Sequence, residues 1–249
     1  VVKEEKRLRV DNQPYGRFLE NVKLHLFKKH PYKGTTIGKM EHLDAATLEE
    51  FIAFNKKFYV PNNATLVVAG DIDKVAVKKM IEDYFGPIPR GAEIERNFPK
   101  EDPITETIKA KAYDPNIQIP AIMAAYRTPS MKTRESRVLD MISSYLITGR
   151  SSVLYKKLVD EKKMALQTGA INLSQEDYGS YILFGLPQGE TSLEDLLAEI
   201  DEEIEKIKTD LISEKDYQKL QNQFENRFVN SNSNVQGIAS SLASYHVMQ

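Results

Sequence analysis

A proline-rich, charged stretch divides the sequence and constrains the fold more than any other feature. Residues 87–103 (PIPRGAEIERNFPKEDP) hold four prolines in seventeen positions and almost no periodic apolar residues. Because proline fixes its own backbone angle and removes a hydrogen-bond donor, such a stretch is typical of a linker. The sequence therefore predicts a first region over residues 1–90, a linker over 91–103 and a second region over 104–249.

The composition indicates a folded protein and excludes several kinds of site. The 249 residues are 41% hydrophobic and 28% charged, which is typical of a globular chain long enough for one large domain or two ordinary ones. The net charge of −2 argues against a basic nucleic-acid binder. The absence of cysteine excludes thiol catalysis and cysteine-ligated metals. No apolar run approaches the roughly 20 residues of a membrane-spanning helix.

Apolar periodicity and capping residues predict the elements of the first region. Residues 1–12 are interpreted as the tail of a charged helix, and residues 15–29 as a helix with one buried face. The compact run at 64–69 (ATLVVA) predicts a strand, since β-branched residues dominate it. Asp73 is a typical first residue before a helix that ends near Gly86.

An amphipathic helix precedes that strand, and two starting points fit it. Asp44 is a suitable cap, but Thr47 and Glu50 also have the spacing of a capping box that begins slightly later. We expect four apolar side chains of this helix to be buried: Leu48, Phe51, Ile52 and Phe58.

The residue pattern of the second region predicts both strands and helices, so the expected fold class is α+β. Strands are expected near 104–113, 119–127, 166–173 and 179–186. Helices are expected over 133–147, over 151–164, and from Ser192 and Ser213 onwards. We interpret the apolar stripes of the helices within 192–249 as facing the core, with a generic interaction surface as the alternative.

The residues alone give no complete catalytic constellation. The chain has four histidines, none paired four residues apart on a helix: His25, His30, His42 and His246. We interpret them as exposed residues near helix ends, although His30 and His42 flank a glycine-containing loop and could meet. Glu4 and Glu5, taken alone, belong to a solvated helix face. The sequence contains no H-x-x-E-H, G-x-S-x-G or P-loop motif.

Several short strings of the sequence, taken in order, resemble a known family, although no catalytic motif in the chain indicates one. The first region contains DNQPYGR (11–17), HPYKGTTIG (30–38), FYVPNNATLVVAGDID (58–73) and YFGPIP (84–89). The second contains AAYRTP (124–129), GRSSVLYKKLV (149–159) and EKKMA (161–165). Together they resemble bacterial M16 zinc metallopeptidases of the pitrilysin, insulinase and processing-peptidase kind. The match runs from the second half of that family's first domain into the first half of its second, as far as about residue 190.

The resemblance implies a fold of repeated α+β units, each with helices packed on one face of an antiparallel-rich sheet. It also implies a zinc site in which an H-x-x-E-H helix supplies two histidine ligands and a catalytic glutamate. A glutamate on a later helix supplies the third ligand, and VVKEE (1–5) resembles that helix. By this resemblance Glu5 is the third zinc ligand in the intact parent. Glu4 is the alternative, about 100° away around the helix.

Two departures limit what the resemblance implies for this chain. H-x-x-E-H is absent, so we expect a fragment that binds no catalytic zinc and hydrolyses nothing alone, because a zinc site needs three or four donors. Many members also carry an arginine and a tyrosine that contact the substrate carbonyl. Val159 and Leu166 occupy those positions here and cannot donate a hydrogen bond, which puts that contribution in doubt.

The resemblance further implies partners, a role and a location. The intact parent would cleave peptides or unfolded polypeptides that add to a sheet edge. The alternative is a non-catalytic M16-like subunit that binds or presents peptides to an active partner. We expect the chain to pair with an N-terminal half or a second M16 subunit, or to self-associate. The resemblance favours a periplasmic or otherwise exported protein over a cytoplasmic one.

Overall fold

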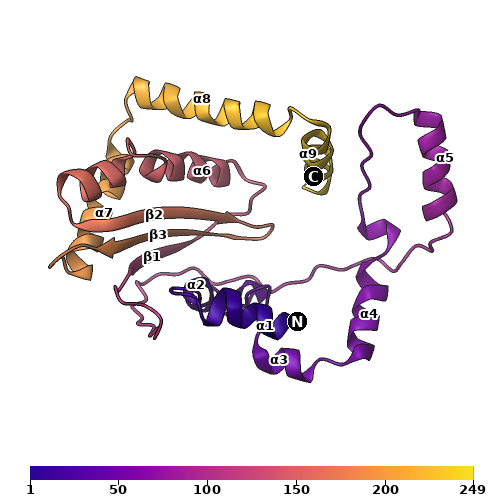
Figure 1. The fold of residues 1–249 in the computed structure, drawn as a ribbon, viewed down its shortest axis with the longest axis horizontal. Coiled ribbons are helices and arrows are strands. Elements are labelled where there is room, and N and C mark those ends of the chain that lie inside the picture. Colours follow the sequence, from indigo (N-terminus) through magenta and orange to yellow (C-terminus); the bar gives the residue numbers. More distant parts are fainter. Residues whose placement is uncertain (249) are drawn as a thin grey trace. The chain divides into compact units, whose positions relative to one another are not determined.

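The computed structural model describes residues 1–248, which form two compact units. Unit 1 consists of Val1–Ile37 and Pro99–Asn222, and unit 2 of Gly38–Phe98 and the residues from Gln223 onwards (Figure 1). The first 37 residues therefore belong to the same compact unit as the segment that follows the linker. The boundaries expected for homologous domains, at 1–90 and 104–249, stay a prediction.

A three-stranded antiparallel sheet forms the centre of unit 1 (Figure 1). Its strands are β1 (Ile122–Thr128), β2 (Ala165–Ser174) and β3 (Gly179–Pro187), in the order β1-β3-β2. The central strand aligns Tyr181 with Tyr126 of β1 and with Asn172 of β2. The predictions of strands near 119–127, 166–173 and 179–186 are confirmed, and so is the α+β fold class.

One face of the sheet is covered by helices from the second half of the chain. Helix α6 (Arg134–Ile147), helix α7 (Leu193–Thr209) and the π-helical segment η4 (Tyr155–Glu161) pack there. Leu183 of β3 points into this layer, and Gly185 leaves room for α7, because a Cβ at Gly185 would lie 2.8 Å from Leu196. The buried core on this side contains Leu146, Leu154, Leu158, Ala165, Ala170, Tyr181, Leu183, Leu196 and Ile200.

The opposite face of the sheet is covered by a helix from the start of the chain. Helix α2 (Phe18–Leu26) buries Val22, Leu26 and the adjoining Phe27 against Ile182 of β3. Because successive residues of a strand point to opposite faces, Ile182 faces α2 while Leu183 faces α7. The sheet is thus buried on both faces, which accounts for the nearly continuous burial of β3.

Local capping signals place the helices as predicted. Thr133, Ser192 and Ser213 each accept a backbone N–H three residues ahead, at the starts of α6, α7 and α8 (Glu214–Ser231). Leu196 and Ile200 of α7 are buried, so the core interpretation holds for that helix. No helix within residues 1–248 is both long enough and apolar enough to cross a membrane.

Unit 2 contains short helices joined by extended segments. They are α3 (Met40–Ala45), α4 (Leu48–Phe58), α5 (Lys74–Phe85) and α9 (Val235–Val247). Of the two possible starts of the α4 helix, the structure has the capping box: the Glu50 amide donates to Thr47 Oγ1 at 3.3 Å, and the Thr47 amide donates to Glu50 Oε2 at 2.9 Å. Asp73 caps α5 as expected, accepting from the amides of Val75 and Ala76.

Two predicted strands are wrong, and so are the predicted core faces of α4 and of α9, which exposes Val235, Ile238 and Leu242. Residues 64–69 and 104–113 are extended but not paired into a sheet. The reason is that a strand is completed by hydrogen bonds to a neighbour, and β propensity alone does not supply one. The apolar side of α4 is exposed: Leu48, Phe51 and Ile52 lie open to solvent, with Phe51 63% exposed.

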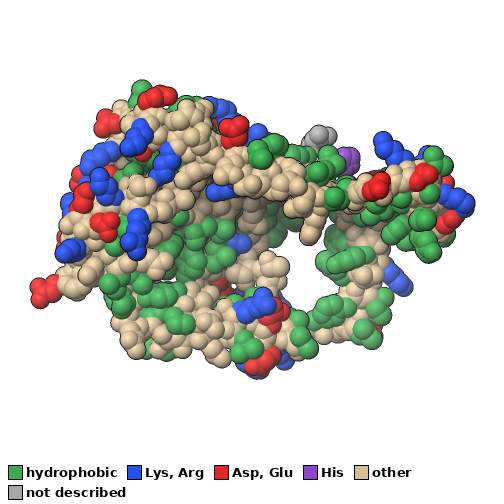
Figure 2. All heavy atoms as spheres, turned by 45° about the horizontal axis from the view of Figure 1, so that its top comes forward, with side chains coloured by type: hydrophobic (Ala, Val, Ile, Leu, Met, Phe, Trp, Pro, Cys, Tyr) green, Lys and Arg blue, Asp and Glu red, His purple; other side chains and the backbone are tan. Residues whose placement is uncertain are grey.

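Unit 2 consequently carries an unusual amount of exposed apolar surface. Hydrophobic side chains reach the surface in the right-hand part of Figure 2, where Figure 1 places α4 and α5. On α5 the exposed side chains include Val75, Met80 and Tyr84. Large contiguous apolar areas are uncommon on isolated monomers and indicate a surface that associates with other polypeptide.

Candidate functional site

Glu5 lies on the first helix and is partly open to solvent. Helix α1 (Val2–Lys6) continues directly into a π-helical turn, Arg7–Asp11. The Glu5 side chain is 43% exposed, and its Oε1 atom lies 3.2 Å from Arg9. Glu4 forms the equivalent exposed pair with Arg7 at 3.0 Å. Exposed pairs of this kind contribute about 0–1 kcal/mol, so neither carboxylate is firmly held by its partner.

Glu5 has no companions that would complete a metal site within the part of the chain described. Among residues 1–248 no three histidine, cysteine, aspartate or glutamate side chains gather closely enough to hold a metal ion.

His30 is not exposed, which corrects the interpretation made from the sequence. It is only 2% exposed, whereas His25, His42 and His246 are exposed as expected. The ring lies among Phe27, Tyr32 and Tyr178. Phe27 and Tyr32 are close to His30 in the sequence, but the third aromatic partner, Tyr178, is far from it, so the local pattern did not indicate burial.

Polar contacts fix the orientation of the His30 ring. Its Nδ1 atom accepts the Tyr32 amide at 3.2 Å, and its Nε2 atom lies 3.3 Å from Asp177 Oδ2. Asp177 belongs to the turn between β2 and β3, so this contact joins the loop after α2 to the sheet. We assign His30 a structural role on these contacts.

A buried ion pair beside His30 joins α2, the end of the linker and β1. Glu101 Oε1 accepts three successive amides, from Lys28, Lys29 and His30, at 2.9, 2.7 and 2.7 Å. Its Oε2 atom lies 3.3 Å from Nη1 of Arg127, and the Glu101 side chain is 2% exposed. We call Glu101 and Arg127 the linker ion pair.

Arg127 extends the linker ion pair to the neighbouring backbone. It donates to the Leu26 carbonyl at 3.0 Å and to the Asp102 carbonyl. Its guanidinium carbon lies 5.6 Å from the centre of the Tyr178 ring, whose hydroxyl accepts the Glu101 amide at 3.0 Å. The sequence did not single out this group, although Arg127 lies in the AAYRTP string and His30 in HPYKGTTIG.

The linker ion pair predicts acid-sensitive stability. Burial alone would raise the pKa of Glu101, but the three amide donors and Arg127 outweigh it and hold the pKa below its ordinary value. A carboxyl whose pKa is depressed on folding stabilises the protein above its unfolded pKa, near 4.3, and this contribution is lost as the pH falls through the folded pKa.

We therefore expect the stability difference between the parent and Glu101→Gln to shrink as the pH falls from about 6 to about 3. Urea unfolding followed by circular dichroism at a series of pH values measures it. A difference that stays constant over this range would show that ionisation of Glu101 contributes nothing.

The two positions that lack the expected arginine and tyrosine have ordinary structural surroundings. Val159 packs against the core beneath α6 and α7. Leu166 lies near the start of β2 and is 49% exposed. Neither side chain carries a hydrogen-bond donor, so neither contributes to binding a carbonyl oxygen.

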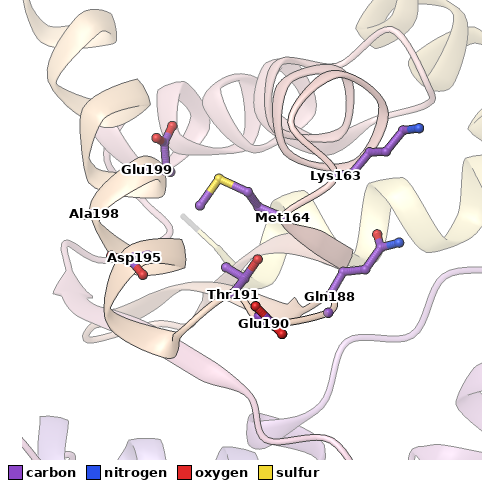
Figure 3. Close-up of a pocket in the computed structure, with 9 residues that line it drawn as sticks. Lys163, Met164, Gln188, Glu190, Thr191, Asp195, Ala198 and Glu199 are labelled. Carbon is purple, nitrogen blue, oxygen red and sulfur yellow. The ribbon is translucent and has the colours of Figure 1, made fainter.

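An open pocket of about 710 Å³ lies between α7 and the loop that follows β3. Figure 3 shows Met164 extending toward α7, with Glu199 above it and Thr191 below. Glu199 is already engaged by Lys162 at 2.5 Å and by Lys157 at 3.5 Å. The Glu199 carboxylate is therefore paired with two lysines, and we assign the pocket no catalytic role.

Comparison with known proteins gives a consistent family assignment. The family described as "Peptidase M16 inactive domain" matches residues 45–224. Zinc protease PqqE of Helicobacter pylori is 27% identical over 249 residues, which cover 99% of this chain and 56% of PqqE. A zinc protease of Bacillus subtilis, YmfH, is 25% identical over 196 residues, covering 76% of this chain and 45% of that protein.

Solved structures agree with the fold. A protease from Helicobacter pylori superimposes with a TM-score of 0.84 at 26% identity, covering 99% of this chain and 60% of the other. The first half of the periplasmic protease PqqL from Escherichia coli gives a TM-score of 0.69 at 18% identity, covering 99% and 54%, which shows likeness of fold alone. The chain thus spans little more than half the length of these proteins. With most of its length matched by the family, the chain belongs to the M16 peptidases, in the part described as their inactive domain.

Proposed function

We propose that this chain forms part of a zinc metallopeptidase that cleaves peptides or unfolded polypeptides. The observation that carries the proposal is the alignment of nearly the whole chain with a protein named a zinc protease, together with the family match. The chain spans 56% of that relative, so the proposed activity belongs to a polypeptide longer than these residues.

In the intact parent, Glu5 would supply the third protein ligand to zinc. Two features of the structure support this assignment. The side chain is partly exposed, and the exposed pair with Arg9 costs little to break. Histidine ligands and the catalytic glutamate would come from an H-x-x-E-H motif elsewhere in the parent. Zinc bound there would polarise the scissile carbonyl and activate water.

The substitution Glu5→Gln in the complete polypeptide tests this ligand. We expect zinc affinity to fall at least about 100-fold and peptidase activity to fall with it, because loss of an inner-sphere ligand exceeds the 10–100-fold effect of outer contacts. Zinc content by atomic spectroscopy and hydrolysis of a fluorogenic peptide are the measurements. Glu4→Gln is the comparison, since Glu4 is the alternative ligand and a more exposed neighbour on the same helix. Equal zinc content in both variants would remove the assignment.

The 249-residue chain alone is proposed to be inactive. It contains no H-x-x-E-H, and a single carboxylate does not retain catalytic zinc. Addition of zinc to the isolated chain should therefore produce no hydrolysis of peptides that the complete enzyme cleaves.

A second candidate is a non-catalytic subunit that binds or presents peptides. The family description "inactive domain" favours it, as do Val159 and Leu166 at the positions of the arginine and tyrosine. The two candidates separate on the parent's own sequence: an H-x-x-E-H motif favours the peptidase, and its absence favours the subunit.

We infer that the partner of this chain is the other half of an M16 enzyme. The exposed apolar side chains of unit 2 and the unpaired segments 64–69 and 104–113 support this partner. Unpaired strand-like segments gain stability by pairing with another chain. By likeness to the periplasmic protease PqqL, we propose that the parent is exported.

Isolated, the chain is expected to self-associate through the same surface. Sedimentation velocity should show dimers or larger species, because apolar residues such as Phe51 and Ile52 are left open to water. Phe51→Ser should shift the distribution toward monomer, whereas Lys56→Ser on the polar side of the same helix should not. A clean monomer at high concentration would contradict this expectation.

A further inference from the structure

We propose that Asp114 is a positioning residue for Glu5: it fixes the end of the helix that carries Glu5. The inference rests on the proposed function, because the purpose of the positioning depends on Glu5 being a metal ligand. Asp114 follows the linker in the sequence, whereas Glu5 lies before it. A residue of the second region would thus set the position of a ligand contributed by the first.

The contact between Asp114 and the first region is made through Tyr15. The Tyr15 amide donates to Asp114 Oδ2 at 2.9 Å, and the Tyr15 hydroxyl donates to the Ile119 carbonyl at 2.7 Å. Tyr15 has a φ of 58°, a left-handed conformation that a residue with a side chain rarely adopts. Such a conformation persists where the surroundings hold it, and here both the backbone and the side chain of Tyr15 are held by residues 114–119.

The last turn of the helix is fastened at the same place. Asn116 donates through its side chain to the Asp11 carbonyl at 3.0 Å, which satisfies a carbonyl at the helix end. Asp114 Oδ1 in turn accepts the Asn116 amide at 2.9 Å, so one carboxylate orients both contacts. Gly16 allows the close turn, because a Cβ at this position would lie 2.0 Å from the Val10 carbonyl oxygen.

The position of Glu5 depends on how firmly the far end of its helix is held by residues 114–119. Glu5 is six residues from Asp11, which corresponds to about 9 Å along a helix. A tilt of about 20° at the anchored end would displace the Glu5 backbone by about 3 Å. Metal–ligand distances in functional sites are held within about 0.2 Å. The helix must therefore be fixed at its end for Glu5 to serve as a ligand.

Two ion pairs also meet at the end of the helix, on the Asp11 carboxylate. Lys6 is buried and lies 3.3 Å from Asp11, and Arg17 lies 2.9 Å from the same carboxylate. Both pairs join residues within the segment 6–17, and neither reaches a residue of the sheet. Residues 114–119 supply hydrogen bonds that tie this end of the helix to the segment before β1.

The absence of cysteine allows a direct test in the chain itself. Spin labels at Glu4→Cys, on the helix, and Glu135→Cys, on α6, report the separation of two elements of unit 1 by double electron–electron resonance. With Asp114 present we expect one narrow distance distribution. Asp114→Ala should at least about double its width, since a helix released at one end swings through several ångström.

Two variants make the result specific. Asp114→Asn keeps one acceptor oxygen for the Tyr15 amide and should restore most of the narrow distribution. Asp160→Ala removes an exposed carboxylate elsewhere in unit 1 and should leave the distribution unchanged. A distribution for Asp114→Ala as narrow as that of the parent would overturn the inference. If circular dichroism shows that Asp114→Ala does not fold, Asn116→Ala decides, because it removes the side chain that Asp114 orients onto the Asp11 carbonyl: broadening supports the anchor, and an unchanged width overturns it.

The test separates this inference from the proposed function. If Glu5→Gln leaves zinc binding of the complete enzyme intact while Asp114→Ala broadens the distance distribution, Asp114 does fix the helix, but the helix does not present a zinc ligand. If Asp114→Ala leaves the width of the distance distribution unchanged while zinc binding depends on Glu5, the ligand assignment stands and the positioning inference fails.

Discussion

Replacing Glu101 with alanine is expected to lower the free energy of unfolding by about 3 kcal/mol, the lower end of the range for breaking a buried ion pair. The change removes the acceptor that three backbone amides and the Arg127 guanidinium share, although Lys28 and Lys29, which supply two of these amides, lie at the surface. Arg127 keeps two carbonyl acceptors, which is why the larger values of that range are not expected. A fall of about 6–12 °C in melting temperature should accompany the loss.

Urea unfolding followed by far-ultraviolet circular dichroism measures this effect, with tyrosine fluorescence as a second probe because the chain has no tryptophan. Glu106→Ala is the control, since Glu106 is an exposed carboxylate in the following segment. Equal stability of the two variants would show that the linker ion pair does not hold α2, the linker and β1 together.

Phe27→Ala is expected to cost about 3–5 kcal/mol, the range for removing a large buried aromatic side chain. Phe27 is buried at the end of α2 and contacts Tyr32 and Tyr178 edge-on or tilted, at ring separations of 5.8 and 6.0 Å. The substitution removes the main anchor between this helix and its face of the sheet. Hydrogen exchange should show the loss of protection concentrated in α2 and β3.

Leu24→Ala on the same helix provides the comparison. Leu24 is 43% exposed, so its truncation should cost less than about 1 kcal/mol. If the two variants unfold at the same urea concentration, α2 does not depend on its packing against the sheet. The Phe27 and Glu101 effects should not add fully, because both act where α2 ends.

Local sequence signals predicted the helices well. The capping residues Asp73, Thr133 and Ser192 each accept a backbone amide within three residues, so the information needed to start these helices lies in a few adjacent positions. Where the sequence left two starts open, at Asp44 and Thr47, the reciprocal capping box with Glu50 decided the outcome. A capping box satisfies two amides rather than one.

Non-local structure was predicted less well. The segment 64–69 has the composition of a strand, but whether it forms one depends on a partner that the sequence pattern does not reveal. The exposed face of α4 has the same origin, since an amphipathic helix is buried only where a complementary surface is present. These two errors lie in unit 2, whereas the other wrongly predicted strand, 104–113, lies in unit 1.

The candidate site shows the same division. Glu5 could be proposed from a short string because the family pattern is local, but no residue pattern indicated that Tyr15 would meet Asp114 across 99 positions. The sequence pattern placed Glu101 in a charged linker, yet in the structure its carboxylate accepts hydrogen bonds from three backbone amides. A charged linker residue is expected to be solvated only where no arginine and no unpaired loop amides lie opposite it.

Whether Glu5 binds zinc in an M16 peptidase is measured most directly by anomalous diffraction at the zinc absorption edge from crystals of the complete enzyme. We expect a zinc peak with a Glu5 carboxylate oxygen about 2.0–2.2 Å away, beside two histidine nitrogens. A fully ligated zinc ion whose coordination sphere excludes Glu5 would contradict it.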